Sequence, residues 1–233
     1  MTPGNKITVI LPCFNEFNTI DKIINLIRKQ KLNIELIVVD DFSDDGTRNK
    51  LKKLIRKREK LILHKKNMGK GAAIKTAKKY ISGKVVIIQD ADLEYSPNDY
   101  KKLISPILKK KIKVVYGSRV LNKRRYSNKE FNSVFRIFAN HVLTITSNLI
   151  NNQALTDSHT CYKVFDASLF KKIKLQENGF SFCPEITTKV SLLNEKIIEV
   201  PISYKGRSYD EGKKINFYDG LHAIKTLINY RFF

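Results

Sequence analysis

The chain has 233 residues, with 44 Lys and Arg against 22 Asp and Glu, so its formal net charge is +22. Its 42% hydrophobic content can build a substantial core, and its ordinary Gly, Pro and Cys contents exclude collagen-like and disulfide-knot classes. We expect one large globular domain with anionic partners. The charge alone does not distinguish nucleic acid, acidic lipid headgroups and phosphorylated substrates. AT-rich coding, which favours Lys, Ile and Asn, would produce the same charge without selection for it.

No apolar run approaches the ~20 residues that cross a bilayer, and the N-terminus lacks a basic segment followed by an apolar signal core. We therefore expect a chain that stays on the side of the membrane where it is made. Cys13, Cys161 and Cys183 are widely spaced, without a C-x-x-C pair or a zinc-ligand pattern. They predict reduced thiols of a cytosolic protein.

Short β-branched runs alternate with helical periodicity from residue 6 to residue 116. The predicted strands are 6–12, 35–40, 61–64, 84–89 and 113–116, and the predicted helices are 20–27, 46–58, 71–81 and 97–108. Asn18 is the expected N-cap of the first helix, with Asp21 three residues further on. Because continuously apolar strands alternate with helices, we expect an α/β fold with a mostly parallel sheet and helices on both faces.

Acidic residues follow the predicted strands at the edge where such sheets bind ligands. Asp40 and Asp41 end the second strand, and Asp90 and Asp92 end the fourth. Side by side, these carboxylates would raise one another's pKa unless a cation compensates, which indicates a bound divalent metal. The D-x-D pair of Asp90 and Asp92 suits Mg²⁺ or Mn²⁺, because both ions prefer oxygen ligands.

Other motifs are less specific or exclude a function. Asp44, Asp45 and Gly46 are typical of a turn and a helix cap. Residues 67–72 (NMGKGA) resemble a phosphate-binding loop but lack the G-x-x-x-x-G-K-[ST] spacing, and no G-x-G-x-x-G follows the first strand. A P-loop NTPase and a dinucleotide dehydrogenase are therefore disfavoured, and no G-x-S-x-G elbow indicates a hydrolase.

Several segments between residue 7 and about residue 230 are distinctive as a set. They are ILPCFNE, IVVDDFSDDGT, NMGKGAAI, IIQDADLEY, VVYGSR, TDSHTCYKVF, GFSFCPEI, EVPISYKGR and EGKKI. In this order they resemble the inverting GT-A glycosyltransferases of family 2, in the dolichol-phosphate mannosyltransferase and polyprenyl-phosphate glycosyltransferase branch. The chain departs from that pattern at His159 and Thr160, where relatives tend to have a Ser-Gly-like pair, and at Glu94, a position often occupied by Gln.

The resemblance implies one GT-A domain over residues 1–233 that transfers a sugar, with inversion, from a nucleotide-diphosphate sugar to a polyprenyl (dolichyl or undecaprenyl) phosphate. The residues that it places around the nucleotide sugar are Pro12, Phe14, Glu16, Asp41, Lys70, Asp90, Arg207 and Lys214. The residues that it places on the metal are Asp90, Asp92 and Glu94, and those on the acceptor phosphate are Arg119 and Arg136. Arg forks bind phosphate oxygens bidentately, which agrees with these roles, although Arg136 and Lys214 also fit a solvated surface.

Two acids receive a catalytic role from the resemblance. Asp92 would help to hold the metal, and the metal, Arg207 and Lys214 would neutralise the leaving diphosphate. Asp157 would act as a base or orient the acceptor, and a structural hydrogen-bonding role is its alternative. A phosphate monoester has a second pKa near ~6, so its oxygen needs positioning more than deprotonation.

The C-terminal segment 216–233 shows helical spacing of apolar residues beside basic ones. The apolar positions are Phe217, Leu221, Ile224, Leu227 and Ile228, with Lys225 and Arg231 nearby. It predicts an amphipathic helix on an anionic membrane surface, and with the resemblance it indicates a peripheral enzyme on the cytoplasmic face. The same pattern fits a helix packed on its own domain. The sequence does not decide whether the chain forms a homo-oligomer or binds a membrane-protein partner.

Competing function classes are less well supported. A sugar-phosphate nucleotidyltransferase would carry a glycine-rich basic loop after the first strand, where this chain has PCFNE. A nucleic-acid-binding module would explain the charge, but no RRM, zinc-finger or helix-turn-helix signature occurs, so we expect no nucleic-acid partner. A family 2 enzyme that glycosylates a sugar or glycan remains an alternative, and the nucleotide, the sugar and the polyprenol are undetermined.

Overall fold

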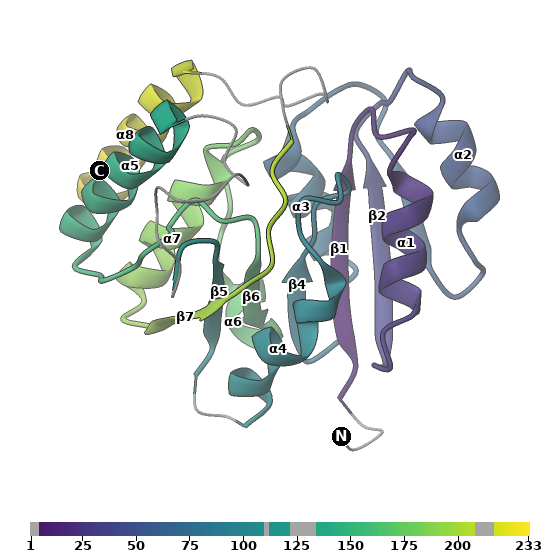
Figure 1. Cartoon of the computed structure of the whole chain (residues 1–233), viewed down its shortest axis with the longest axis horizontal. Coiled ribbons are helices and arrows are strands. Elements are labelled where there is room, and N and C mark those ends of the chain that lie inside the picture. The colour runs from purple at the N-terminus through teal and green to yellow at the C-terminus, as the bar shows by residue number, and fades with distance from the viewer. Residues whose placement is uncertain (1–4, 110–111, 122–133, 208–216) are drawn as a thin grey trace.

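The structure is a computed structural model that describes residues 5–109, 112–121, 134–207 and 217–233, without the side chains of residues 134–137 and 217–219. In this part of the chain, seven strands form one sheet in the order β3-β2-β1-β4-β6-β5-β7 (Figure 1). The strands are β1 (Ile7–Cys13), β2 (Ile34–Asp40), β3 (Lys60–Leu63), β4 (Val85–Ile88), β5 (Val114–Ser118), β6 (Lys163–Asp166) and β7 (Ile197–Pro201).

The sheet is mostly parallel, as predicted. Strand β1 pairs in parallel with β2 and β4, β2 pairs with β3, and β5 pairs with β7. Strand β6 runs antiparallel to both β4 and β5. The carboxyl ends of β1, β2 and β4 therefore meet at one edge, where ligands of such sheets bind.

Helices cover both faces of the sheet, which confirms the predicted fold class. The helices are α1 (Ile20–Arg28), α2 (Thr47–Leu54), α3 (Lys70–Lys78), a 3-10 turn (Pro97–Asp99), α4 (Tyr100–Leu108), α5 (Val134–Asn151), α6 (Ala167–Lys172), α7 (Phe182–Leu192) and α8 (Phe217–Phe232). Side chains alternate across β1, so Val9 and Leu11 pack with α1 and α4, whereas Ile10 packs with α3, α6 and α7.

Two local predictions need correction. The N-cap of α1 is Thr19 rather than Asn18, and the Thr19 hydroxyl donates to the Glu16 carboxylate at 2.8 Å. Helix α2 ends at Leu54 rather than near residue 58, because Ile55 takes an extended backbone and the Arg28 guanidinium donates to the Leu54 carbonyl at 2.9 Å. The predicted turn at Asp45 is present, since its carboxylate accepts from the Thr47 amide at 2.9 Å.

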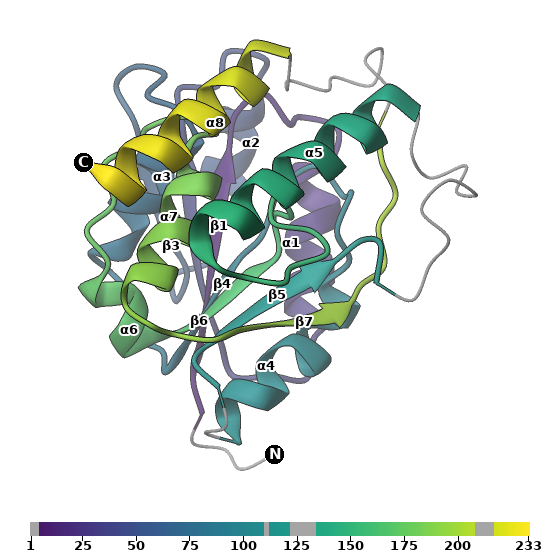
Figure 2. The ribbon, with the colours of Figure 1, turned by 90° about the vertical axis from the view of Figure 1, so that its left-hand side faces the viewer.

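Helices α5 and α8 lie side by side and both pack on α7 (Figure 2). Helix α8 covers most of the segment predicted to be helical, and it packs on the domain through the buried Ala223 and Leu227. Its other side leaves Leu221, Ile228 and Phe232 exposed. Packing on the domain and an exposed apolar side thus occur in the same helix.

Candidate functional site

A cavity of about 370 Å³ opens at the carboxyl ends of β1, β2 and β4. The predicted site residues that line it are Pro12, Phe14, Glu16, Asp41, Lys70, Asp90, Asp92, Glu94, Arg119 and Arg207. They come from segments that span most of the chain, so the fold brings the predicted nucleotide, metal and acceptor residues to one place.

Two of the predicted residues lie elsewhere, and the side chains of two others are outside the described residues. Asp157 is fully buried beside Arg119 and does not line the cavity. Asp40, expected beside the other acids, is also absent from the cavity wall, because its Oδ2 lies 2.6 Å from the Arg48 Nε. Arg136 belongs to α5, but its side chain lies outside the described residues, and so does all of Lys214.

The glycine segment after β3 is shaped by Asp41. The Oδ1 of Asp41 lies 2.6 Å from the His64 Nδ1 and accepts from the Met68 amide at 2.9 Å, and its Oδ2 accepts from the Gly69 amide at 2.6 Å. Gly69 has a φ of +92°, and a Cβ there would lie 2.5 Å from the Asn178 carbonyl oxygen. This close packing and positive φ require glycine at position 69. Helix α3 begins at the next residue, Lys70, which lines the cavity.

Lys70 and Asp90 form a partly buried ion pair in the cavity wall. The Lys70 Nζ lies 2.5 Å from the Asp90 Oδ1 and 3.2 Å from the Cys161 Sγ. Burial, the largest single effect, would raise the pKa of Asp90, but the Lys70 charge, hydrogen bonds from Cys161 and Lys70, and the Arg207 charge together outweigh it, so the pKa falls below its usual value. Asp90 is therefore held as a carboxylate by a lysine from the glycine segment.

Asp92 and Glu16 share the guanidinium of Arg207. The Arg207 Nη2 lies 3.2 Å from the Asp92 Oδ2, and its Nη1 and Nη2 each donate to Glu16 at 3.1 Å. Burial, followed by the charges of Asp90 and Glu94, raises the pKa of Asp92 to about 7. This rise agrees with the mutual repulsion expected of neighbouring acids.

Glu94, in the loop after β4, accepts hydrogen bonds from the chain that follows β7. Its Oε1 accepts from the Arg207 amide at 2.7 Å and its Oε2 from the Tyr204 hydroxyl at 2.9 Å. Within the described ranges, no three His, Cys, Asp or Glu side chains are arranged to hold a metal ion. Asp90 and Asp92 instead contact Lys70 and Arg207, so cationic groups lie where the metal is predicted.

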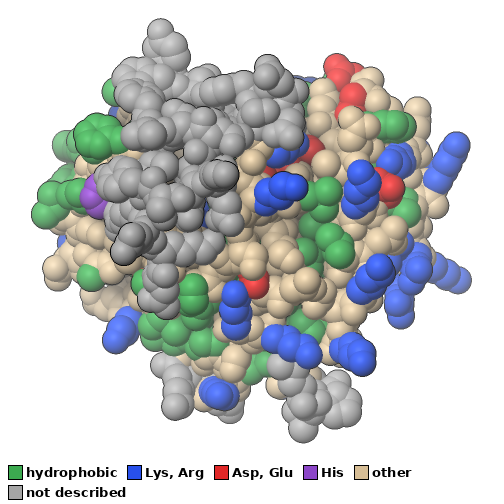
Figure 3. Space-filling model, in the orientation of Figure 1, with side chains coloured by type: hydrophobic (Ala, Val, Ile, Leu, Met, Phe, Trp, Pro, Cys, Tyr) green, Lys and Arg blue, Asp and Glu red, His purple; other side chains and the backbone are tan. Residues whose placement is uncertain are grey.

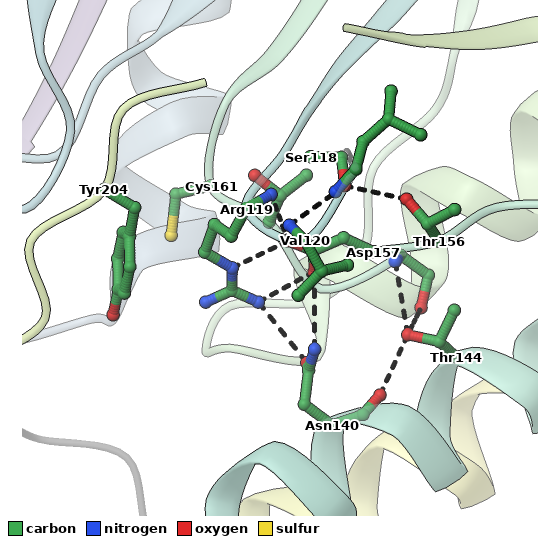
Figure 4. A network of polar contacts seen from close by, with 12 residues as sticks. Ser118, Arg119, Val120, Asn140, Thr144, Thr156, Asp157, Cys161 and Tyr204 are labelled. Atoms are coloured by element: carbon green, nitrogen blue, oxygen red, sulfur yellow. Dashed lines mark hydrogen bonds and ion pairs between the residues drawn. The ribbon is translucent and has the colours of Figure 1, made fainter. Parts of the chain in front are cut away.

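Arg119 and the fully buried Asp157 form a second ion pair at the end of β5 (Figure 4). The Arg119 Nε donates to the Asp157 Oδ2 at 2.7 Å, and the Nη2 donates to the Oδ1 at 2.7 Å. Burial, the largest single effect, would raise the pKa of Asp157, but the charge and hydrogen bonds of Arg119, with the charge of Lys163, together outweigh it and lower the pKa. Asp157 therefore stays ionised and bound to Arg119.

The remaining surfaces of the Arg119 guanidinium face other groups. The Tyr204 ring lies 5.2 Å from the guanidinium carbon, a cation–π distance. No side chain in the described part of the chain bonds to Nη1, which points away from Asp157 in Figure 4. Because Arg119 lines the cavity, this nitrogen can donate to an anion there.

Sequence reasoning missed several residues of the cavity wall, among them Tyr95, Cys161 and Tyr204. Tyr204 lies within the family segment EVPISYKGR, but it was assigned no role from the sequence. His159, noted only as a departure from the family pattern, also lines the cavity, and burial followed by the Lys163 charge lowers its pKa to about 3. A neutral imidazole therefore lies in this wall at physiological pH.

The Glycosyl transferase family 2 model matches residues 8–174. The chain belongs to this family. It is therefore a glycosyltransferase, as its motifs predicted, and the nucleotidyltransferase and nucleic-acid-binding alternatives lose their support.

Similar proteins include two lipid-phosphate glycosyltransferases. Dolichol-phosphate mannosyltransferase of Pyrococcus furiosus is 29% identical over 89% of this chain, which spans 59% of that relative's length. UDP-N-acetylglucosamine--dolichyl-phosphate N-acetylglucosaminyltransferase of Methanococcus voltae is 26% identical over 95% of this chain and 94% of its own. Both names agree with the predicted branch of the family.

The fold also matches solved structures. Glucosyl-3-phosphoglycerate synthase of Mycobacterium tuberculosis, in complex with Mn²⁺, uridine diphosphate and phosphoglyceric acid, aligns with a TM-score of 0.69. The alignment covers 98% of this chain and 79% of that one at 19% identity. At this identity the likeness establishes a shared glycosyltransferase fold.

Proposed function

We propose that this enzyme transfers a sugar, with inversion, from a nucleotide-diphosphate sugar to a polyprenyl phosphate. Three observations support this proposal. The chain belongs to family 2, the two similar proteins above are named for transfer to dolichyl phosphate, and one cavity holds both carboxylates and an arginine that can receive an anion.

The donor would bind at the acidic end of the cavity. Asp90 and Asp92, with Glu94, would hold Mg²⁺ or Mn²⁺, because these carboxylates already lie against cationic side chains and suit a hard divalent ion. When bound, the ion would neutralise charge on the leaving diphosphate. Pro12, Phe14, Glu16, Asp41 and Lys70 would surround the nucleotide, and Arg207 and Lys214 would contact its phosphates.

The Arg119–Asp157 pair is the observation that carries the choice of acceptor. A neutral hydroxyl generally needs a positioned base, but both oxygens of Asp157 are bound by Arg119. A phosphate monoester is largely ionised at neutral pH, since its second pKa is near about 6. Arg119, joined by Arg136, would therefore hold an acceptor that arrives already charged, while Asp157 orients Arg119.

Helix α5 supports a lipid-linked acceptor because its polar side is buried and its apolar side is exposed. Thr144, Ser147 and Asn151 are at most 2% exposed, whereas Phe138, Val142, Ile145 and Leu149 are 40–79% exposed. The exposed residues recur at helical spacing and form one stripe. A stripe of this kind marks a surface that binds apolar material.

We therefore propose that α5 and α8 place the enzyme peripherally on the cytoplasmic face of a membrane. The exposed side chains of the neighbouring α8, Leu221, Ile228 and Phe232, would add to the stripe of α5. In the described part of the chain, no helix has the length and apolarity to cross a membrane. In Figure 3, hydrophobic side chains occur along the edge that α5 and α8 occupy in Figure 1, and many Lys and Arg side chains lie towards α2.

A donor screen followed by transfer tests this function. GDP-mannose, UDP-glucose and UDP-N-acetylglucosamine, each with Mg²⁺ or Mn²⁺, would be compared by thermal unfolding, since a bound donor stabilises in proportion to its affinity. The donor selected would then be incubated with a short polyprenyl phosphate. We expect a glycosyl-phosphate lipid in the organic extract, and a donor that binds without any such product would contradict the proposal.

A further inference from the structure

Asn140 of α5 bridges both members of the Arg119–Asp157 pair. Its Oδ1 accepts from the Arg119 Nη2 at 3.4 Å, and its Nδ2 donates to the Asp157 Oδ1 at 3.4 Å (Figure 4). A carboxamide carries a donor and an acceptor on one planar group, so it can serve the cation and the anion together. Neither Asp nor Leu at this position could do both.

The next turn of α5 holds the chain that follows Asp157. The Ser158 amide and hydroxyl donate to the Thr144 Oγ1 at 3.4 and 3.3 Å, and the Thr144 hydroxyl donates to the Asn140 carbonyl at 2.8 Å. Glu199 of β7 holds the other side of this segment, since its carboxylate accepts from the Asp157 amide at 2.9 Å. Asp157 is therefore fixed between the sheet and α5.

We infer that Asn140 is a positioning residue that fixes α5 against Arg119 and so orients the guanidinium for the acceptor. This inference rests on the proposed function, and it adds a residue that the family motifs did not indicate. Position 136 lies one helical turn before Asn140, so the same contact sets where α5 carries Arg136 relative to Arg119. The Asn140 side chain would thus fix the positions of the two predicted acceptor-binding residues, Arg119 and Arg136, relative to each other.

The test compares Asn140→Leu, which keeps the size but removes both hydrogen bonds, with Thr146→Val on the same helix. Thr146 bonds only to the Val142 carbonyl of its own helix among the described residues, so it controls for a change in α5 itself. We expect Asn140→Leu to raise the acceptor KM about three- to tenfold, as the loss of ordinary hydrogen bonds would do, with the donor KM unchanged. The control should match the wild type.

A second readout does not need turnover. The Nε–H signal of Arg119 in a ¹⁵N spectrum, assigned by its loss in Arg119→Lys, should shift and exchange faster in Asn140→Leu but not in Thr146→Val. Asn140→Asp, which sets a carboxylate beside Asp157, should move this signal further, and it replaces Asn140→Leu if that variant does not fold.

The two readouts separate failure of this inference from failure of the proposed function. If polyprenyl phosphate is not the acceptor, the Arg119 signal still reports the contact. An unchanged signal in both Asn140 variants would overturn the inference. Equal rises of donor and acceptor KM would also overturn it, because they would indicate a general structural role.

Discussion

The guanidinium of Arg119 binds both carboxylate oxygens of Asp157, with two N–O distances of 2.7 Å. Because Asp157 is fully buried and the Arg119 side chain is only 13% exposed, each charge depends on the other, and Arg119 lines the cavity. Asp157, which the resemblance assigned to act as a base or to orient the acceptor, with a structural role as the alternative, therefore acts in our account by orienting Arg119.

Removing Arg119 alone should harm stability as well as acceptor use. Arg119→Met leaves the buried Asp157 without its partner, which costs about 3–5 kcal/mol. The double variant Arg119→Met/Asp157→Asn should recover much of that stability, because the uncompensated charge is gone. It should still fail to use the acceptor, as measured by urea unfolding and acceptor kinetics. Recovery of acceptor use in the double variant would show that Arg119 does not bind the acceptor.

Donor binding should depend on Asp92 and on a divalent metal. Asp92→Asn should fold normally yet weaken binding of the nucleotide sugar and abolish transfer, since the amide is a poorer ligand for a hard cation. Asp44→Asn is the matched control, because Asp44 is an exposed turn residue that bonds Asn15. Calorimetry with and without EDTA measures the effect, and donor affinity that is indifferent to both EDTA and Asp92→Asn would refute the metal assignment.

Membrane binding should be lost when the apolar stripe of α5 receives a charge. Leu149 is 79% exposed, so Leu149→Glu should leave folding intact while sharply reducing co-sedimentation with liposomes. Lys52→Glu on α2, also an exposed position, serves as the control for charge. Binding should rise with anionic lipid and fall with salt, because the screening length is about 8 Å at physiological ionic strength. If Leu149→Glu binds like the wild type, another surface contacts the membrane.

Glu35 should make the stability depend on pH. Burial would raise its pKa, but bonds from Ser82, Thr8 and Lys6 outweigh it and lower the pKa from 4.5 to about 2. A carboxyl whose pKa is lowered by folding stabilises the native state above its unfolded pKa, and this contribution is lost as the pH falls from 4.5 towards 2. Urea unfolding of Glu35→Gln should therefore show a smaller loss of stability over this range than the wild type, and equal slopes would contradict the assignment.

The sheet could be predicted from local sequence because its strands are short apolar runs and its acids follow them directly. Asp90 and Asp92 were found because they follow β4 closely in the sequence, and the fold then places them at the cavity. The contacts within the site were harder to predict, because they join distant segments. Arg119 and Asp157 are 38 residues apart, and no local pattern indicates that they pair.

Helix α5 shows most clearly why the sequence alone does not predict how the site is assembled. Its most exposed side chains are apolar and its buried ones are polar, so periodicity alone would orient it the wrong way round. Asn140 carries no motif and gains its role only from the two side chains that it meets. Asp41 was predicted as a site residue from its motif, but only the structure shows that its carboxylate accepts hydrogen bonds from the Met68 and Gly69 amides.

A competition between three acceptors decides whether the acceptor is a phosphate. The enzyme, its donor and a divalent metal would be given equal amounts of a short polyprenyl phosphate, the matching polyprenol and a simple sugar, and the products would be identified by mass spectrometry. We predict that the sugar is transferred to the phosphate almost exclusively, because Arg119 binds an anion while Asp157 is not available as a base. Transfer to the alcohol or the sugar at a rate comparable to that of the phosphate would contradict the account.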